Sequence, residues 1–164
     1  MPFFHRLLGV LSLTLLPSLG WAQPVEADHE THQIEPGTPE LILSGIYSIP
    51  LGWDGPMAPG HEVHLTYWVT HKLGGGFSYT TRYEGHLAHD IALIGSWNAA
   101  HWLTVNTGPN FGLANEERPF ELGLYLETEC NWRLTDWFHL GPVVGWVFGE
   151  HSELNTGIQV GFEF

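Results

Sequence analysis

Basic residues are scarce in this 164-residue sequence, which has 5 Lys and Arg against 18 Asp and Glu, and a formal net charge of −13. Nucleic-acid binding is disfavoured, because proteins neutralise phosphates with Lys and Arg. The same charge balance favours the attraction of cations.

Cysteine is also scarce: Cys130 is the only one. No disulfide can therefore form within the chain. An exported protein with a single cysteine has either a shielded thiol or an intermolecular partner for it.

Long apolar runs are missing, since no stretch after the N-terminal segment approaches the roughly 18 consecutive apolar residues of a membrane helix. Residues 1–22 combine a short basic start, an apolar run from Leu7 to Leu16 and a small-residue end at Ala22. This pattern predicts a cleaved signal peptide. Residues 23–39 are polar and without periodicity, which predicts a disordered periplasmic leader. The remainder is expected to be a periplasmic, secreted or β-barrel protein.

Aromatic residues and glycine are abundant, at 13% of the chain and 20 residues respectively. The last ten residues show the clearest pattern, because Ile158, Val160, Phe162 and Phe164 alternate with polar or small residues. Strict alternation predicts a β-strand with one apolar face. In an outer membrane barrel, lipid covers such a face.

Similar alternation recurs from residue 40 onward and predicts eight strands. The predicted strands are residues 40–49, 61–71, 76–84, 89–98, 101–112, 119–132, 137–149 and 155–164. Tight turns at 71–76, 98–101 and 133–136 alternate with polar connections at 50–60, 85–88, 113–118 and 150–154. The predicted fold is all-β, an eight-stranded antiparallel up-and-down transmembrane β-barrel over residues 40–164, with both termini periplasmic. Pro109 and Pro142 predict bulges in their strands.

The alternation also assigns faces to the side chains. The lipid-facing set includes Leu93, Leu122, Leu124, Val144 and Val160. The interior set is Glu62, Glu84, Asp90, Glu121, Glu127, Glu129 and Glu163 with Arg82. Such an interior predicts a packed, hydrogen-bonded lumen rather than an open pore. An interfacial aromatic belt is expected near the tight turns, formed by Trp68, Trp97, Trp102, Trp132 and Trp137.

The signal peptide, the strand number, the loop asymmetry and the terminal Gly-Phe-Glu-Phe give the chain a family resemblance. It resembles the small eight-stranded outer membrane β-barrels of Gram-negative bacteria, of the type found in the membrane domain of outer membrane protein A. The resemblance implies a place in the outer membrane, contact with its lipid, and recognition of Phe164 by the barrel assembly machinery. It specifies architecture and says little about activity.

The first functional expectation is therefore an outer membrane barrel of unassigned activity, structural or ligand-binding through its outer loops, without nucleic acid as partner. The alternative is a divalent-metal-binding protein, because histidine and carboxylate at the outer rim suit zinc, copper or nickel. The candidate ligands are His86, His89 and Asp90, with His61, His64 or His151.

Two further alternatives stay open. A lipid-modifying outer membrane enzyme would need a serine, a histidine and a carboxylate within reach of one another. The sequence has no G-x-S-x-G motif, and the adjacent His151 and Ser152 would face opposite sides of a strand. No catalytic residue is therefore assigned. The last alternative is a soluble periplasmic metal-binding protein of the cupin type, with its apolar faces turned inward.

Overall fold

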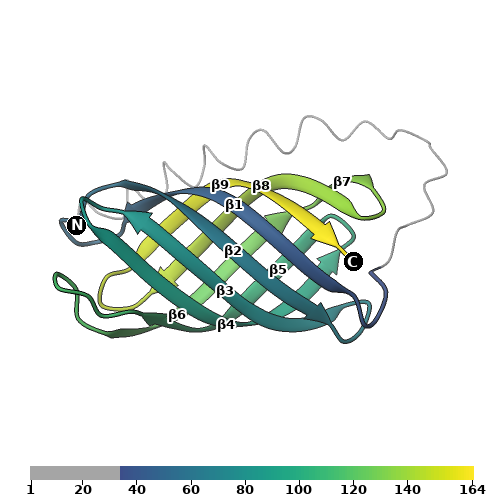
Figure 1. Ribbon diagram of the computed structural model, residues 1–164, viewed down its shortest axis with the longest axis horizontal. Coiled ribbons are helices and arrows are strands. Elements are labelled where there is room, and N and C mark those ends of the chain that lie inside the picture. The colour runs from purple at the N-terminus through teal and green to yellow at the C-terminus, as the bar shows by residue number, and fades with distance from the viewer. Residues whose placement is uncertain (1–33) are drawn as a thin grey trace, which may run out of the picture. The chain divides into compact units, whose positions relative to one another are not determined.

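The computed structural model describes residues 34–164, so the predicted signal peptide and residues 23–33 of the predicted leader lie outside the described part. Tilted antiparallel strands form a barrel around a central axis (Figure 1). The strands are β1 (Pro39–Pro50), β2 (Ala58–Trp68), β3 (Leu73–Tyr83), β4 (Leu87–Ala100), β5 (Leu103–Gly112), β6 (Glu121–Cys130), β7 (Trp132–Thr135), β8 (Phe138–Phe148) and β9 (Glu153–Glu163). No helix within residues 34–164 is long and apolar enough to cross a bilayer.

The sheet closes on itself, because consecutive strands pair from β1 to β6 and from β7 to β9, and β1 pairs with β9 from Glu40↔Glu163 to Pro50↔Glu153. Pairing of β6 with β8 completes the circuit. The short β7 continues the register of β6 along β8, so the two form one barrel strand interrupted at Asn131. The described chain is thus the predicted eight-stranded antiparallel barrel, without an unpaired sheet edge.

The two ends of the barrel differ. We call one the turn end: it holds Pro39, Glu163 and the short connections 69–72, 101–102 and 136–137. The opposite, loop end holds the connections 51–57, 84–86, 113–120 and 149–152. The predicted asymmetry in length holds for the connections 51–57 and 113–120, whereas 84–86 and 149–152 are no longer than the turn at 69–72.

Pro109 and Pro142 do not cause the predicted bulges. Each stays in register with one neighbouring strand, opposite Leu124 and Ile158 respectively. On its other side each lies at a gap in the ladder, because proline has no N–H to donate. The bulge prediction was therefore wrong. The register shifts fall beside two tight turns, at Asn98/Ala100 and at Arg133/Thr135.

The predicted faces are confirmed on the outer wall. Leu93, Leu122 and Leu124 are exposed, and the less exposed Val144 and Val160 share their outward orientation. Large apolar side chains cover this outer surface on every side of the barrel. A contiguous apolar surface of this extent is unusual for a soluble monomer and is typical of contact with lipid.

Four of the five predicted belt tryptophans, namely Trp97, Trp102, Trp132 and Trp137, are exposed near the turn end. Trp68 does not belong to the belt: it is 0% exposed, and its Nε1 donates to Glu40 Oε2 at 2.9 Å inside the barrel. The reason is its place on β2, where it shares the inward face with other buried residues.

The described part of the predicted leader has defined contacts. Ile34 is buried and its carbonyl lies 2.8 Å from His71 Nδ1. The N–H of Gly37 donates to the carbonyl of Trp68 at 2.7 Å, and the N–H of Trp68 donates to the carbonyl of Thr38 at 3.0 Å. Residues 34–38 therefore pack against the end of β2, and β1 begins at Pro39.

Candidate functional site

Polar side chains fill the barrel from end to end and form three clusters. The loop-end cluster comprises Arg82, Glu84, Asp90, Arg118, Glu121, His151 and Glu153. The central cluster comprises Glu62, His64, Thr80, Asn106, Tyr125, Glu127 and Glu129. The turn-end cluster comprises Glu40, Trp68, Arg133, His139 and Glu163. Strand alternation explains this arrangement, since every second residue points inward.

In the loop-end cluster a single buried guanidinium faces three carboxylates. Arg82 Nη1 lies 2.5 Å from Asp90 Oδ2, and Arg82 Nε lies 2.8 Å from Glu84 Oε1 and 3.1 Å from Glu153 Oε2. The Nη1 contact is an ion pair without the alignment of a hydrogen bond. Arg118 adds contacts to Asp90 at 3.2 Å and to Glu121 at 2.9 Å. Two guanidinium groups thus hold the acids of this end together.

A pocket opens next to this cluster, at the loop end of the barrel. Its walls come from all four connections and include Trp53, Glu84, His86, Glu117, Arg118, Pro119, His151 and Glu153. His86 Nδ1 lies 2.8 Å from Glu117 Oε2. His151 pairs with Glu121, and its ring meets Trp53 edge-on at 4.8 Å between centroids. We call this hollow the rim pocket; it brings two histidines and several carboxylates to one opening.

The central cluster crosses the lumen, because its residues come from strands on different walls. His64 on β2 has Nε2 at 2.6 Å from Glu62 Oε1 and Nδ1 at 3.1 Å from Glu129 Oε1 on β6. Glu127 Oε1 lies 3.5 Å from the same Nδ1. The Tyr125 hydroxyl donates to Glu62 Oε1 at 2.8 Å. These buried contacts close the middle of the barrel with side chains.

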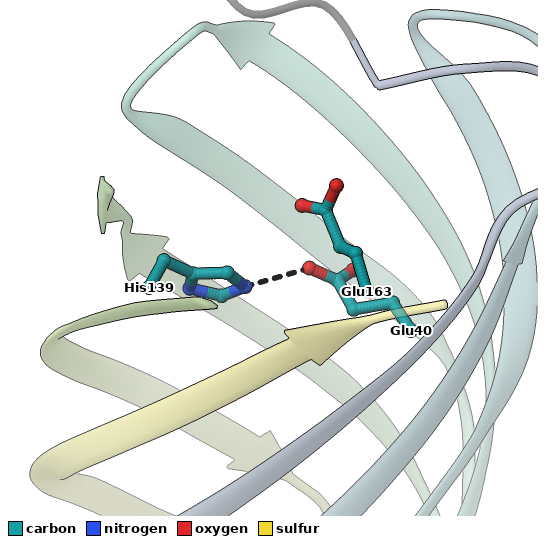
Figure 2. Close-up of side chains that lie close together, drawn as sticks. All are labelled: Glu40, His139 and Glu163. Atoms are coloured by element: carbon teal, nitrogen blue, oxygen red, sulfur yellow. Dashed lines mark hydrogen bonds and ion pairs between the residues drawn. The ribbon is translucent and has the colours of Figure 1, made fainter. Parts of the chain in front are cut away.

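The turn-end cluster is built around the two strands that meet at the barrel seam. Figure 2 shows the ring of His139 directed at Glu40, with Nε2 at 2.8 Å from Glu40 Oε1. Glu163 lies beside them and pairs with Arg133. Because Trp68 occupies the second oxygen of Glu40, both carboxylates of this cluster already have a donor.

The six candidate metal ligands predicted from the sequence do not form one site. His89 and Asp90 are successive residues of β4, so their side chains lie on opposite sides of the wall. Asp90 pairs inside with Arg82, whereas His89 Nδ1 lies 2.8 Å from the Tyr79 hydroxyl on the outer face. A single site made by His86, His89 and Asp90 is therefore not formed.

The other candidates are also separated. His61 faces outward, 3.2 Å from the Tyr83 hydroxyl. His64 lies in the central cluster and not at the rim with His86. Only His86 and His151 share a setting, the rim pocket. The adjacent Ser152 uses its hydroxyl on the backbone of Gly149.

Sequence reasoning missed part of the buried network. Glu153 was expected in a loop but is buried beside Arg82. His139, which the predicted interior set does not include, is buried and contacts Glu40, 99 residues away. Alternation could identify the inward side chains, but only the strand register shows which of them meet across the lumen.

The fold matches known barrels. The N-terminal β-barrel domain of Pseudomonas aeruginosa OprF superposes with a TM-score of 0.63 at 15% identity, over 80% of this chain and 100% of that domain. The outer membrane protein OprG of the same species gives 0.57 at 10% identity, over 81% and 98%. Ail, the attachment invasion locus protein of Yersinia pestis, gives 0.54 at 10% identity, over 79% and 99%.

Sequence comparison adds nothing to this likeness. No protein-family model matches the chain, and no curated protein matches it. At identities of 10 to 15%, the structural matches identify the fold alone. Any activity has to be inferred from the residues of the site.

Proposed function

Because the described chain has the fold of the small eight-stranded outer membrane β-barrels, we propose that this protein is a non-enzymatic outer membrane barrel whose lumen is closed by its own side chains. The observation that carries this proposal is the inversion of polarity: large apolar side chains cover the outside, while most buried side chains are polar or charged and only a few, such as Ile94 and Val147, are apolar. Lipid is the solvent that suits this arrangement.

A closed lumen follows from the central cluster. Barrels of eight strands are only wide enough for side chains to fill them. Here His64 on β2 reaches Glu129 on β6 across the barrel, and Tyr125 reaches back to Glu62. The protein therefore serves as a compact membrane anchor that presents its loop end, rather than as a diffusion pore.

We expect no steady ionic conductance from the barrel in a planar lipid bilayer, because buried side chains occupy the passage. A sixteen-stranded porin reconstituted in the same bilayer is the control, since it leaves an open aqueous channel. Uniform, long-lived conductance steps from this protein would contradict a closed lumen.

In the proposed orientation the turn end is periplasmic and the loop end is extracellular, as short periplasmic turns are typical of these barrels. Ligand binding through the outer loops would then use the rim pocket. Of the six candidate metal ligands predicted from the sequence, His86 and His151 alone line this pocket. They are therefore the histidine ligands that we propose for divalent-metal capture at the rim. This second proposal is supported by the neighbouring carboxylates of Glu84, Glu117 and Glu153.

We further propose that the barrel assembly machinery recognises the C-terminal aromatic residue. Phe164 is 73% exposed on the outer side of the seam, and its N–H donates to the carbonyl of Pro39 at 3.0 Å. Its ring thus makes little contribution to the packed interior.

Deletion of Phe164 is expected to slow assembly into membranes in cells more than deletion of Glu35 does. The two deletions each remove one residue near the turn end, and the readout is the fraction of folded barrel after a pulse of synthesis. Equal rates for the two deletions would count against recognition of the terminal aromatic residue.

A further inference from the structure

The central cluster differs from the other two in its charges. It contains the carboxylates of Glu62, Glu127 and Glu129 around the single imidazole of His64. The basic side chains in residues 34–164 lie elsewhere: Arg82 and Arg118 in the loop-end cluster, Arg133 in the turn-end cluster, and Lys72 in an exposed turn. No guanidinium or ammonium group of the described chain therefore balances these acids.

This imbalance is large for a buried site. All four side chains are almost fully buried. Even a protonated His64 would offset one of three carboxylate charges. Buried charges in proteins are paired, neutralised by protons or bound to metal ions, because an unpaired ionised carboxylate in a low dielectric is very costly.

A second observation is the presence of buried oxygen atoms without donors. Glu129 Oε2 and Asn106 Oδ1 are buried and have no hydrogen-bond partner. Their companion atoms are already used, since Asn106 Nδ2 donates to Glu129 Oε1 at 2.8 Å. Both unpartnered atoms are acceptors, and acceptors are satisfied by a proton donor or by a cation.

We propose that the central cluster binds a divalent transition-metal ion of the zinc type through Glu62, His64 and Glu127, with Glu129 as a further oxygen ligand. The donor atoms of the first three residues all lie within 4.8 Å of one another. Ligands held at about 2.0–2.2 Å from one tetrahedral ion lie about 3.3–3.6 Å apart, so the most distant donor atoms would approach one another by about 1 Å. A pair already in direct contact, such as His64 Nε2 and Glu62 Oε1 at 2.6 Å, would separate if both atoms bind the ion. Imidazole nitrogen with carboxylate oxygen is a donor set that zinc accepts.

The other two clusters, unlike the central one, contain guanidinium groups that contact their carboxylates. Glu40 accepts from Trp68 and contacts His139, and Glu163 pairs with Arg133. The loop-end acids surround Arg82 and Arg118. A cation in the loop-end cluster, or at Glu163, would compete with a guanidinium, whereas in the central cluster it would compete only with neutral hydrogen-bond donors, with His64 and with protons.

Side chains close the lumen on both sides of the central cluster, so the ion would enter while the barrel folds. The test is to refold the full chain into detergent with zinc chloride, remove loose metal with EDTA and gel filtration, and measure zinc by mass spectrometry. Folding is verified by heat-modifiable migration. We expect about one zinc ion per folded chain, because a multidentate site that forms only on folding holds its metal tightly, whereas EDTA removes any metal bound at the open rim pocket.

Four variants make the result specific. Glu127→Gln and His64→Gln are expected to lower retained zinc at least tenfold; the isosteric Glu127→Gln keeps the test valid if His64→Gln does not fold. His139→Gln in the turn-end cluster and the His86→Ala/His151→Ala double variant at the rim pocket are the controls, and both should retain zinc. Zinc-free wild-type barrel would overturn the proposal, as would zinc that persists in folded Glu127→Gln or that is lost only with the rim histidines.

Discussion

Replacing Arg82 by methionine is expected to lower the free energy of unfolding by about 3–5 kcal/mol, the cost of leaving buried charges without their partner. The guanidinium contacts Asp90, Glu84 and Glu153, all within 3.1 Å. Methionine fills a similar volume but leaves three carboxylates facing one another. Urea unfolding of the barrel in lipid vesicles, followed by tryptophan fluorescence, measures the loss.

The matched control is Lys72→Met, which removes the same charge from an exposed turn. Surface changes of this kind stay within about 0.5 kcal/mol. Adding Asp90→Asn to Arg82→Met should restore part of the lost stability, because it removes one of the uncompensated charges. Equal stability of the Arg82 and Lys72 variants would show that the loop-end network is not structural.

Replacing Leu93 by arginine is expected to cost about 2–4 kcal/mol, the penalty for a basic residue at the bilayer midplane on the lipid face of a barrel. Leu93 lies near the middle of β4, opposite Phe77 on β3, and is 54% exposed on the outer wall. The same urea unfolding in vesicles gives the difference from wild type.

Leu73→Arg is the control, because Leu73 is 56% exposed on the same wall but is the first residue of β3, beside a turn. Near the interface the penalty falls to about 0–1 kcal/mol, since a long basic side chain reaches the headgroups. If the two variants lose the same stability, the apolar outer wall does not lie in lipid in the proposed way.

Much of the fold could be predicted from the sequence, because each strand carries its own signal. Alternation in segments such as residues 155–164 identifies both the strand and its outward face, and eight such segments suffice for a closed barrel. Trp68 shows that strand alternation outweighs residue type. Tryptophan near a turn suggests the interfacial belt, but the position of Trp68 on β2 directs its side chain into the barrel.

Local irregularities were not predictable from residue type. Proline removes a donor, but whether the strand then bulges or merely leaves a gap depends on the partner strand. Pro142 stays in register with Ile158 and coincides with the interruption between β6 and β7. The sequence shows that proline lacks a donor N–H, but it does not show which of the two adjacent strands faces the resulting gap in the ladder.

The site was the least predictable part. His86 and His89 are close in sequence, yet one lies at the rim pocket and the other faces outward beside Tyr79. Conversely, Glu62 and Glu127 are far apart in sequence and meet in the central cluster. Contacts across a lumen depend on strand order, tilt and register together, so spacing along the chain carries little information about them.

The central claim is that this barrel, apolar outside and largely polar inside, resides in the outer membrane. Separating the membranes of cells that produce the protein tests this claim most directly. The account predicts that it sediments with the outer membrane, dissolves only in detergent, and migrates faster on gels before boiling than after. Recovery of the folded protein in the soluble periplasmic fraction would contradict it.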